Sequence, residues 1–166
     1  MYSRIMNVLN NIDSRYPTRA EEQEVLAYAQ SVPRRLKAAN AVQQIEMDLI
    51  QHSIEEMRQR YPRFVTLHDR GWEKSTRDMQ LCLRYAVQGM LVEDLEMPKR
   101  KLFIWLGTII KAMGMTTTFS RDSYEILRDV CRKRLGADDY GLLEPYLTQL
   151  IADMSSFIEP SRPAVG

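Results

Sequence analysis

The stretch from Pro33 to Arg60 is PRRLKAANAVQQIEMDLIQHSIEEMRQR. Its apolar residues recur at steps of three and four, which is the spacing of one face of an α-helix. They are Leu36, Ala39, Val42, Ile45, Leu49, Ile50, Ile54 and Met57. Proline is favoured at the first position of a helix, and Tyr61-Pro62 is a stop signal. The stretch therefore predicts a long helix over 33–60 with one apolar stripe.

The residues before Pro33 predict two shorter helices. The first covers Ser3 to Ile12, and the segment 13–17 (DSRYP) breaks it. Thr18 and Glu21 have the spacing of a capping box, so a second helix is expected to begin there and to end near Ser31.

The residues after Tyr61 predict a loop over 63–71 and then four helices. We expect these helices at 72–92, 98–113, from Ser120 to Leu135, and at 138–157. Gly114 and Gly136 are expected to end the second and the third of them. Nothing alternates with a period of two, so the chain is predicted to be all-α, with about seven or eight helices. We expect a single domain over 1–158, with a helical pair at 1–31, and a loose tail at 159–166.

Composition narrows the classes of function. The chain has 166 residues, 27% of them charged, and a net charge of +1, which gives no case for electrostatic binding to nucleic acid or to an anionic membrane. Cys82 and Cys131 lack metal-site spacing, so both are expected to be reduced and to pack in the core. No stretch is apolar and long enough to predict a signal peptide or a membrane span. No phosphate loop, metal motif or nucleophile elbow occurs, so we expect no catalytic residues, no metal and no enzyme.

Several short motifs, taken in order, resemble a phycobiliprotein subunit of the allophycocyanin α type. They are Asp13-Ser-Arg-Tyr-Pro-Thr, Ser75-Thr-Arg-Asp followed by Leu83-Arg-Tyr and Gly89, the proline-started helix after Glu93-Asp94, and Gly136-Ala-Asp-Asp. The resemblance covers about residues 5–157. It implies a globin-like phycobiliprotein fold with a six-helix core plus two N-terminal helices that pair one subunit with another.

The resemblance also assigns roles to residues on the 72–92 helix. Ser75 stands where the family carries the cysteine that holds a bilin by a thioether. A hydroxyl does not replace a thiolate in that bond, so covalent attachment is not expected. Arg77 and Asp78 match the residues that contact the propionate and the pyrrole nitrogens of the pigment. We therefore expect no cofactor. The alternative is a noncovalent bilin or another tetrapyrrole held by Arg77 and Asp78.

The implied function is that of a pigment-free, allophycocyanin-like adaptor of the cyanobacterial phycobilisome or photosystem. The implied partner is a phycobiliprotein β-type subunit or a second copy, and antenna or photosystem proteins are further candidates. Ile5, Leu9 and Ile12 are the expected contacts, and Arg84 is expected to pair with Asp78 or an acidic partner. We expect the protein in the cytoplasm, at the cytoplasmic face of the thylakoid. A heme-binding globin is a further alternative, but neither His52 nor His68 lies where a proximal ligand is expected.

Overall fold

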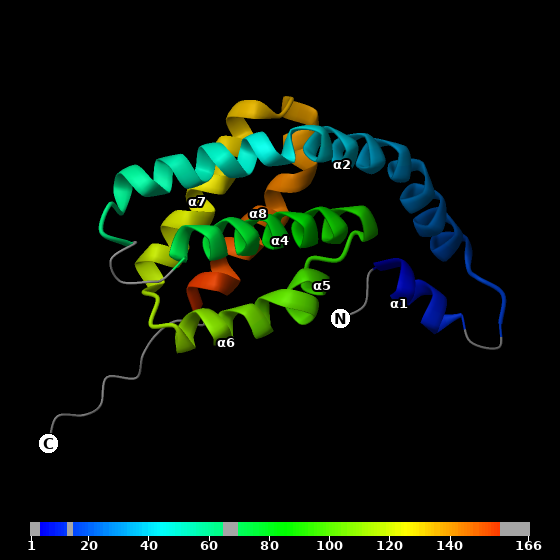
Figure 1. The fold of residues 1–166 in the computed structure, drawn as a ribbon. Coiled ribbons are helices and arrows are strands. Elements are labelled where there is room, and N and C mark those ends of the chain that lie inside the picture. The colour runs from blue at the N-terminus through cyan, green and yellow to red at the C-terminus, as the bar shows by residue number, and fades with distance from the viewer. Residues whose placement is uncertain (1–3, 13–14, 65–69, 157–166) are drawn as a thin grey trace, which may run out of the picture.

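The computed structural model describes residues 4–12, 15–64 and 70–156, apart from the side chains of Arg4, Ile5, Met6 and Leu9. Within these ranges the chain is helical and forms no strand, which confirms the all-α prediction (Figure 1). The elements are α1 (Arg4–Asn11), α2 (Arg19–Arg60), α4 (Gly71–Val92), α5 (Glu96–Pro98), the π-helical turn η1 (Lys99–Phe103), α6 (Ile104–Ala112), α7 (Thr117–Arg134) and α8 (Ala137–Ser156). The expected tail at 159–166 lies outside the described residues.

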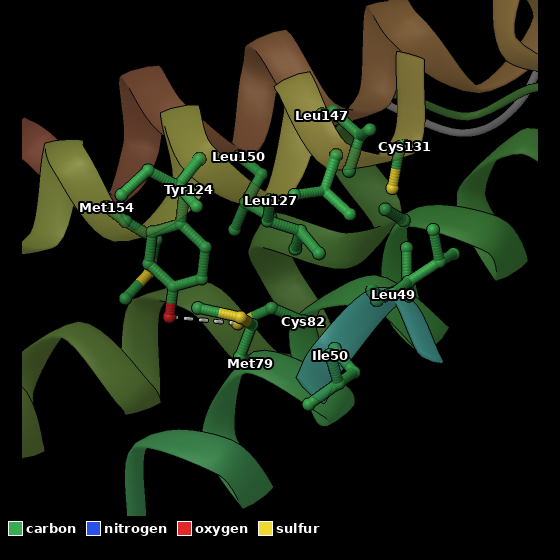
Figure 2. Close-up of a cluster of buried hydrophobic side chains, with 14 of the residues drawn as sticks. Leu49, Ile50, Met79, Cys82, Tyr124, Leu127, Cys131, Leu147, Leu150 and Met154 are labelled. Atoms are coloured by element: carbon green, nitrogen blue, oxygen red, sulfur yellow. Dashed lines mark hydrogen bonds between the residues drawn. The ribbon is translucent and has the colours of Figure 1, made fainter. Parts of the chain in front are cut away.

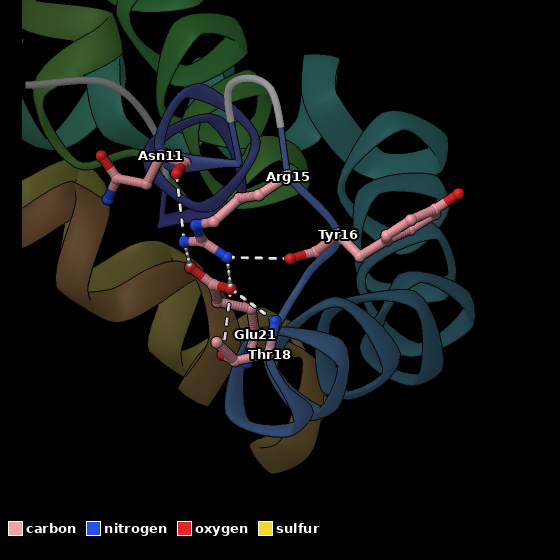
Figure 3. A network of polar contacts seen from close by, with 5 residues as sticks. All are labelled: Asn11, Arg15, Tyr16, Thr18 and Glu21. Carbon is pink, nitrogen blue, oxygen red and sulfur yellow. Dashed lines mark hydrogen bonds and ion pairs between the residues drawn. The ribbon is translucent and has the colours of Figure 1, made fainter.

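The N-terminus of α2 has the predicted capping box. The Thr18 hydroxyl accepts from the Glu21 N–H, and the Glu21 carboxylate accepts from the Thr18 N–H at 2.7 Å. Arg15 extends this network, because its guanidinium donates to both carboxylate oxygens of Glu21, at 2.7 and 2.9 Å, and to the carbonyls of Asn11 and Tyr16 (Figure 3). The Arg15 side chain thus links the end of α1 to the start of α2 by hydrogen bonds.

Helix α2 does not stop at Ser31, so the predicted break before Pro33 is wrong. The helix runs for 42 residues with Pro33 inside it. An interior proline costs a helix about 3 kcal/mol, and contacts next to it offset that cost. Arg35 is buried and donates to the carbonyl of Leu91, at the C-terminal end of α4. Its guanidinium also lies 4.3 Å from the centre of the Tyr28 ring, one turn before the proline.

The core lies where α7, α8 and α4 pack together against α2. Its most buried side chains are leucines from all four helices, with both cysteines and Tyr124 among them (Figure 2). The predicted stripe of α2 is buried at Val42, Leu49, Ile50, Ile54 and Met57, and half-buried at Ala39 and Ile45. Leu36 is the exception, because 48% of it is exposed.

Two other expected boundaries change. The hydroxyl of Thr116, not of Ser120, caps α7, since it accepts from the Phe119 N–H at 3.1 Å. The predicted 98–113 helix is divided by the π-helical turn η1, where Lys99 pairs with buried Asp153 at 3.1 Å. Pro145 lies inside α8, which begins before it at Ala137. Gly114 follows α6 with φ of +74°, in agreement with its predicted role as a stop.

Candidate tetrapyrrole site and pairing surface

The first half of α4 forms one wall of a small cavity beside Ser75. Figure 1 shows α4 beside α7, with α6 below it. Ser75, Asp78 and the other lining residues come from α4, from α6 and the turn after it, and from α7: Gly71, Lys74, Met79, Ile110, Met113, Met115, Phe119, Ser120, Ser123 and Tyr124. The cavity holds about 40 Å³, far below the roughly 300 Å³ at which ligand pockets begin. By itself it cannot take a tetrapyrrole.

Arg77 and Asp78 lie in different environments. Asp78 lines the cavity, and its side chain is 15% exposed, whereas that of Arg77 is 69% exposed and is not part of the lining. The Arg77 guanidinium turns back to Asp78, and its Nε and Nη2 donate to Oδ1 at 3.1 and 3.0 Å. The cavity therefore presents the hydroxyl of Ser75 and the carboxylate of Asp78 from α4, with the arginine outside it.

Neither thiol of the chain is suited to form a thioether with a pigment. Cys82 is fully buried, and its Sγ lies 3.4 Å from the Tyr124 hydroxyl (Figure 2). Burial raises the pKa of Cys82 to about 12, and burial does the same to the pKa of Cys131. Only the thiolate is a nucleophile, so both groups are inert at neutral pH in the folded protein.

A larger groove adjoins the small cavity. It holds about 420 Å³ and is lined by Arg60, Tyr61, Pro62, Arg63, Phe64, Gly114, Met115, Thr116 and Phe119. Met115 and Phe119 line both spaces, so the two are neighbours. This volume falls in the range of small-molecule sites, about 300–1,000 Å³. The sequence analysis missed the groove, although the basic and aromatic run at 60–64 (RYPRF) was a signal for it.

Aromatic stacking builds the wall of the groove. The Phe64 and Phe119 rings stack with centroids 4.5 Å apart, and Tyr61 meets the edge of Phe119 at 5.1 Å. The Tyr61 hydroxyl donates to buried Asp122, which also pairs with Arg60 Nε at 2.9 Å. Burial first, and then the hydrogen bond to Asp122, raise the pKa of Tyr61 to about 12. The phenol therefore stays neutral under physiological conditions.

Trp72 is buried and packs on Phe64, with ring centroids 4.7 Å apart, and it lines neither space. His68 lies outside the described residues. His52, considered for heme, has partners at both ring nitrogens, because Nδ1 lies 2.8 Å from the Asp48 carbonyl and Nε2 lies 2.5 Å from Arg134.

Arg84 lies on a different side of α4, in a groove between α4 and α2. Both of its donors, Nε and Nη2, bind the Glu46 carboxylate, at 2.7 and 2.9 Å. The structure thus pairs Arg84 with Glu46 of α2 and not with Asp78. The groove holds about 390 Å³, and apolar residues of both helices line it together with these two: Leu36, Ala39, Val42, Leu83, Val87 and Leu91, with Asn40, Gln43 and Gln88.

Large apolar side chains continue along α2 next to this groove. Leu26 is 58% exposed, Leu36 48% and Met47 65%. We name Leu26, Leu36, Met47 and the α2–α4 groove the pairing surface. Of the N-terminal residues expected at an interface, Ile12, directly after α1, is half-buried, and the side chains of Ile5 and Leu9 lie outside those described. Val8 is buried, so α1 packs at least in part on its own chain.

Comparisons with known proteins support the resemblance. The family described as "Phycobilisome protein" matches residues 7–154. The allophycocyanin alpha-B chains of Pyropia yezoensis and Porphyra purpurea are each 24% identical over 162 residues, covering 92% of this chain and 99% of theirs. In the part of the chain that the structure describes, no helix combines the length and the apolar character that crossing a bilayer requires.

These relatives also correct one prediction. We expected no cofactor because Ser75 cannot form the thioether, but the relatives are allophycocyanin chains, a class that carries bilin chromophores, and they point to bilin binding. The prediction of no cofactor is therefore wrong. The family model matches residues 7–154 of the chain, and the helical fold agrees with it. The chain therefore belongs to the phycobilisome protein family, whose members build a light-harvesting apparatus.

Proposed function

We propose that the chain is a non-enzymatic, allophycocyanin-like subunit that holds a linear tetrapyrrole without a covalent bond and joins other subunits by protein contact. The observation that carries the proposal is that the Ser75–Asp78 cavity and the apolar groove at residues 60–64 are neighbours, with Met115 and Phe119 lining both. A pigment that is not anchored at position 75 needs a larger noncovalent contact area, and the groove supplies it.

The residues present fit such a pigment chemically. The Asp78 carboxylate can accept from pyrrole N–H groups, since it lies in the cavity wall. Arg60 and Arg63 place guanidinium groups at the groove, where they suit the propionates of a bilin. Phe64 and Phe119 offer flat apolar faces to a conjugated ring system. When bound, the pigment would supply visible absorption, and the chain would supply its shape and its exclusion from water.

The adaptor role rests on the pairing surface. Leu26, Leu36 and Met47 expose large apolar area beside a groove, which is a common property of interaction sites. A phycobiliprotein β-type subunit or a second copy is the proposed partner, with Ile5, Leu9, Ile12 and Arg84 among its contacts. In a family that associates with the thylakoid surface, such a subunit could connect antenna and photosystem proteins.

The pigment is tested by purifying the protein from a host that makes bilins. We expect a visible absorption band that separates from the polypeptide in acid–urea, with no pigment fluorescence on the denatured chain in a zinc-stained gel. The double variant Arg77→Ala, Asp78→Ala should lose most of the band. A matched control is Asp129→Ala, Arg132→Ala, which removes an arginine–aspartate pair of α7 that lines neither the cavity nor the groove, and should keep the colour. A colourless wild-type protein would refute pigment binding.

Pairing is tested separately, by the mass of the complex in solution with a β-type subunit and alone. Leu36→Asp and Met47→Asp place charge on the pairing surface at exposed positions, so they should abolish association while the helical circular dichroism stays unchanged. Normal association of both variants would show that another surface pairs the subunits.

A further inference from the structure

Helix α6 presents an exposed face that neither the pigment site nor the pairing surface uses. Ile104 is 46% exposed and Trp105 60%, and the residues one and two turns further on the same side are exposed as well. We name this set the α6 outer face: Lys101 of η1, with Ile104, Trp105, Thr108, Lys111 and Ala112 of α6. Steps of three and four residues place the α6 members on one side of that helix.

The stretch of sequence that contains this face carries only positive charge. Between Met97 and Arg121 the chain has no aspartate or glutamate, and its five basic residues are Lys99, Arg100, Lys101, Lys111 and Arg121. Lys99 and Arg100 pair with Asp153 and Asp94 of other segments. Lys101 and Lys111 stand at the two ends of the exposed apolar pair. The net charge of +1 is a sum over the whole chain, so it gives no indication of this local excess of positive charge.

The opposite side of the same helix faces inward. Ile110 and Met113 line the cavity beside Ser75, whereas none of the grooves described above includes a residue of the α6 outer face. A face that lines none of these three spaces, with an exposed apolar pair between lysines, suits a flat, anionic surface. Figure 1 shows α6 and α2 at opposite edges of the view, so a contact through α6 leaves the pairing surface accessible.

We propose that the α6 outer face binds the anionic headgroups of a lipid bilayer. An indole has an apolar ring and one N–H donor, and this combination favours the boundary between headgroups and hydrocarbon. Lysines beside it reach the lipid charges while their alkyl stems stay along the apolar surface. This contact would hold the subunit on a membrane without a spanning helix. It goes beyond the proposed function and does not require a bound pigment.

Tryptophan fluorescence tests the contact directly. The chain has two tryptophans, and Trp72 is already 8% exposed inside the core, so only Trp105 can change its solvent greatly on binding. The full chain is titrated with vesicles of phosphatidylglycerol mixed with phosphatidylcholine, and with vesicles of phosphatidylcholine alone. We expect a blue shift and co-flotation with the anionic vesicles only. Both should weaken as salt is raised, because the Debye length is only about 10 Å at 0.1 M.

Variants test whether the α6 outer face, and not another part of the surface, contacts the lipid. Each lysine near an anionic surface strengthens binding about fivefold, so Lys101→Gln with Lys111→Gln should weaken it about 25-fold. Trp105→Ser should abolish flotation and the blue shift. The matched control is Lys37→Gln with Val25→Ser on α2, where both residues are also exposed and neither belongs to the pairing surface, and it should bind as the wild type does.

Three results would overturn the proposal. One is the absence of flotation with anionic vesicles. Another is equal binding to phosphatidylcholine alone. The third is loss of binding in the α2 control but not in the α6 variants. If vesicles fail while an acidic protein protects Trp105 from quenching, the face is a protein interface and the lipid assignment is wrong.

Discussion

Replacing Gly89 by alanine tests how closely α4 approaches the segment that follows it. A Cβ atom at this position would lie 2.7 Å from Pro98 Cγ, 3.0 Å from Tyr146 Cδ1 and 3.1 Å from the Asp94 carbonyl oxygen. The nearest of these belongs to a proline ring and the last to the backbone, so neither can move as a flexible side chain would. The Asp94 N–H also donates to the Gly89 carbonyl at 3.0 Å, which holds that turn in place.

The expected size of the effect follows from two opposing quantities. Overpacking a closed site costs about 1–3 kcal/mol, and alanine in place of an interior helix glycine gains about 0.8–1.0 kcal/mol. Gly89→Ala should therefore lower the free energy of unfolding by about 0–2 kcal/mol. Gly141 in α8 is the control, because a Cβ there would have no atom within 4 Å. Gly141→Ala should raise the same free energy by about 1 kcal/mol.

Urea unfolding followed by circular dichroism measures both changes. In a chain of this size 1 kcal/mol corresponds to about 2–4 °C in Tm, so thermal scans should separate the two variants as well. If Gly89→Ala stabilises the protein as much as Gly141→Ala does, the close packing described for the end of α4 is incorrect.

Further predictions concern the pigment site and two titrating groups. Ser75→Cys in a bilin-producing host should yield pigment that remains on the denatured polypeptide, whereas wild-type pigment is released. The pKa of Tyr61 is about 12 in the folded state and ordinarily about 10, so its contribution to stability is complete below pH 10 and is lost as the pH rises towards 12. The absorbance of the phenolate measures this pKa, and a value of about 10 would exclude the bond to Asp122. The hydrogen bonds from Arg15 and Thr18 lower the pKa of Glu21 to about 2 from 4.5, so its contribution is present above pH 4.5 and is lost as the pH falls towards 2. Nuclear magnetic resonance titration of its carboxyl should give that low value, and Arg15→Ala should raise it.

Local signals predicted most of the helices. The capping box at Thr18 and Glu21 lies within four residues, and the stop at Gly114 depends on one backbone angle, so neither needs tertiary information. Pro33 shows the limit of such signals. Its place inside a helix is stabilised by Arg35, whose partners on α4 are 55 and 56 residues away in sequence.

The candidate site was less predictable, because its parts meet only after folding. Ser75 and Asp78 were identified from a motif, and they do share one wall of a cavity. The apolar groove was not identified, since Phe64 and Phe119 come from segments far apart in the chain and stack through tertiary packing. The partner of Arg84 was missed for the same reason: Glu46 is 38 residues away, on α2.

The continuity of α2 has an optical consequence. Measured along its curved axis, a helix of 42 residues is about 63 Å long, and α2 carries the pairing surface while Arg35 fastens it to the end of α4 (Figure 1). A pigment resting against α4 and a partner resting against α2 would thus be linked through two helices in direct contact. The distance and angle between the transition dipoles of two such pigments would then be set by the fold. Those two quantities govern how efficiently excitation energy passes from one subunit to the next.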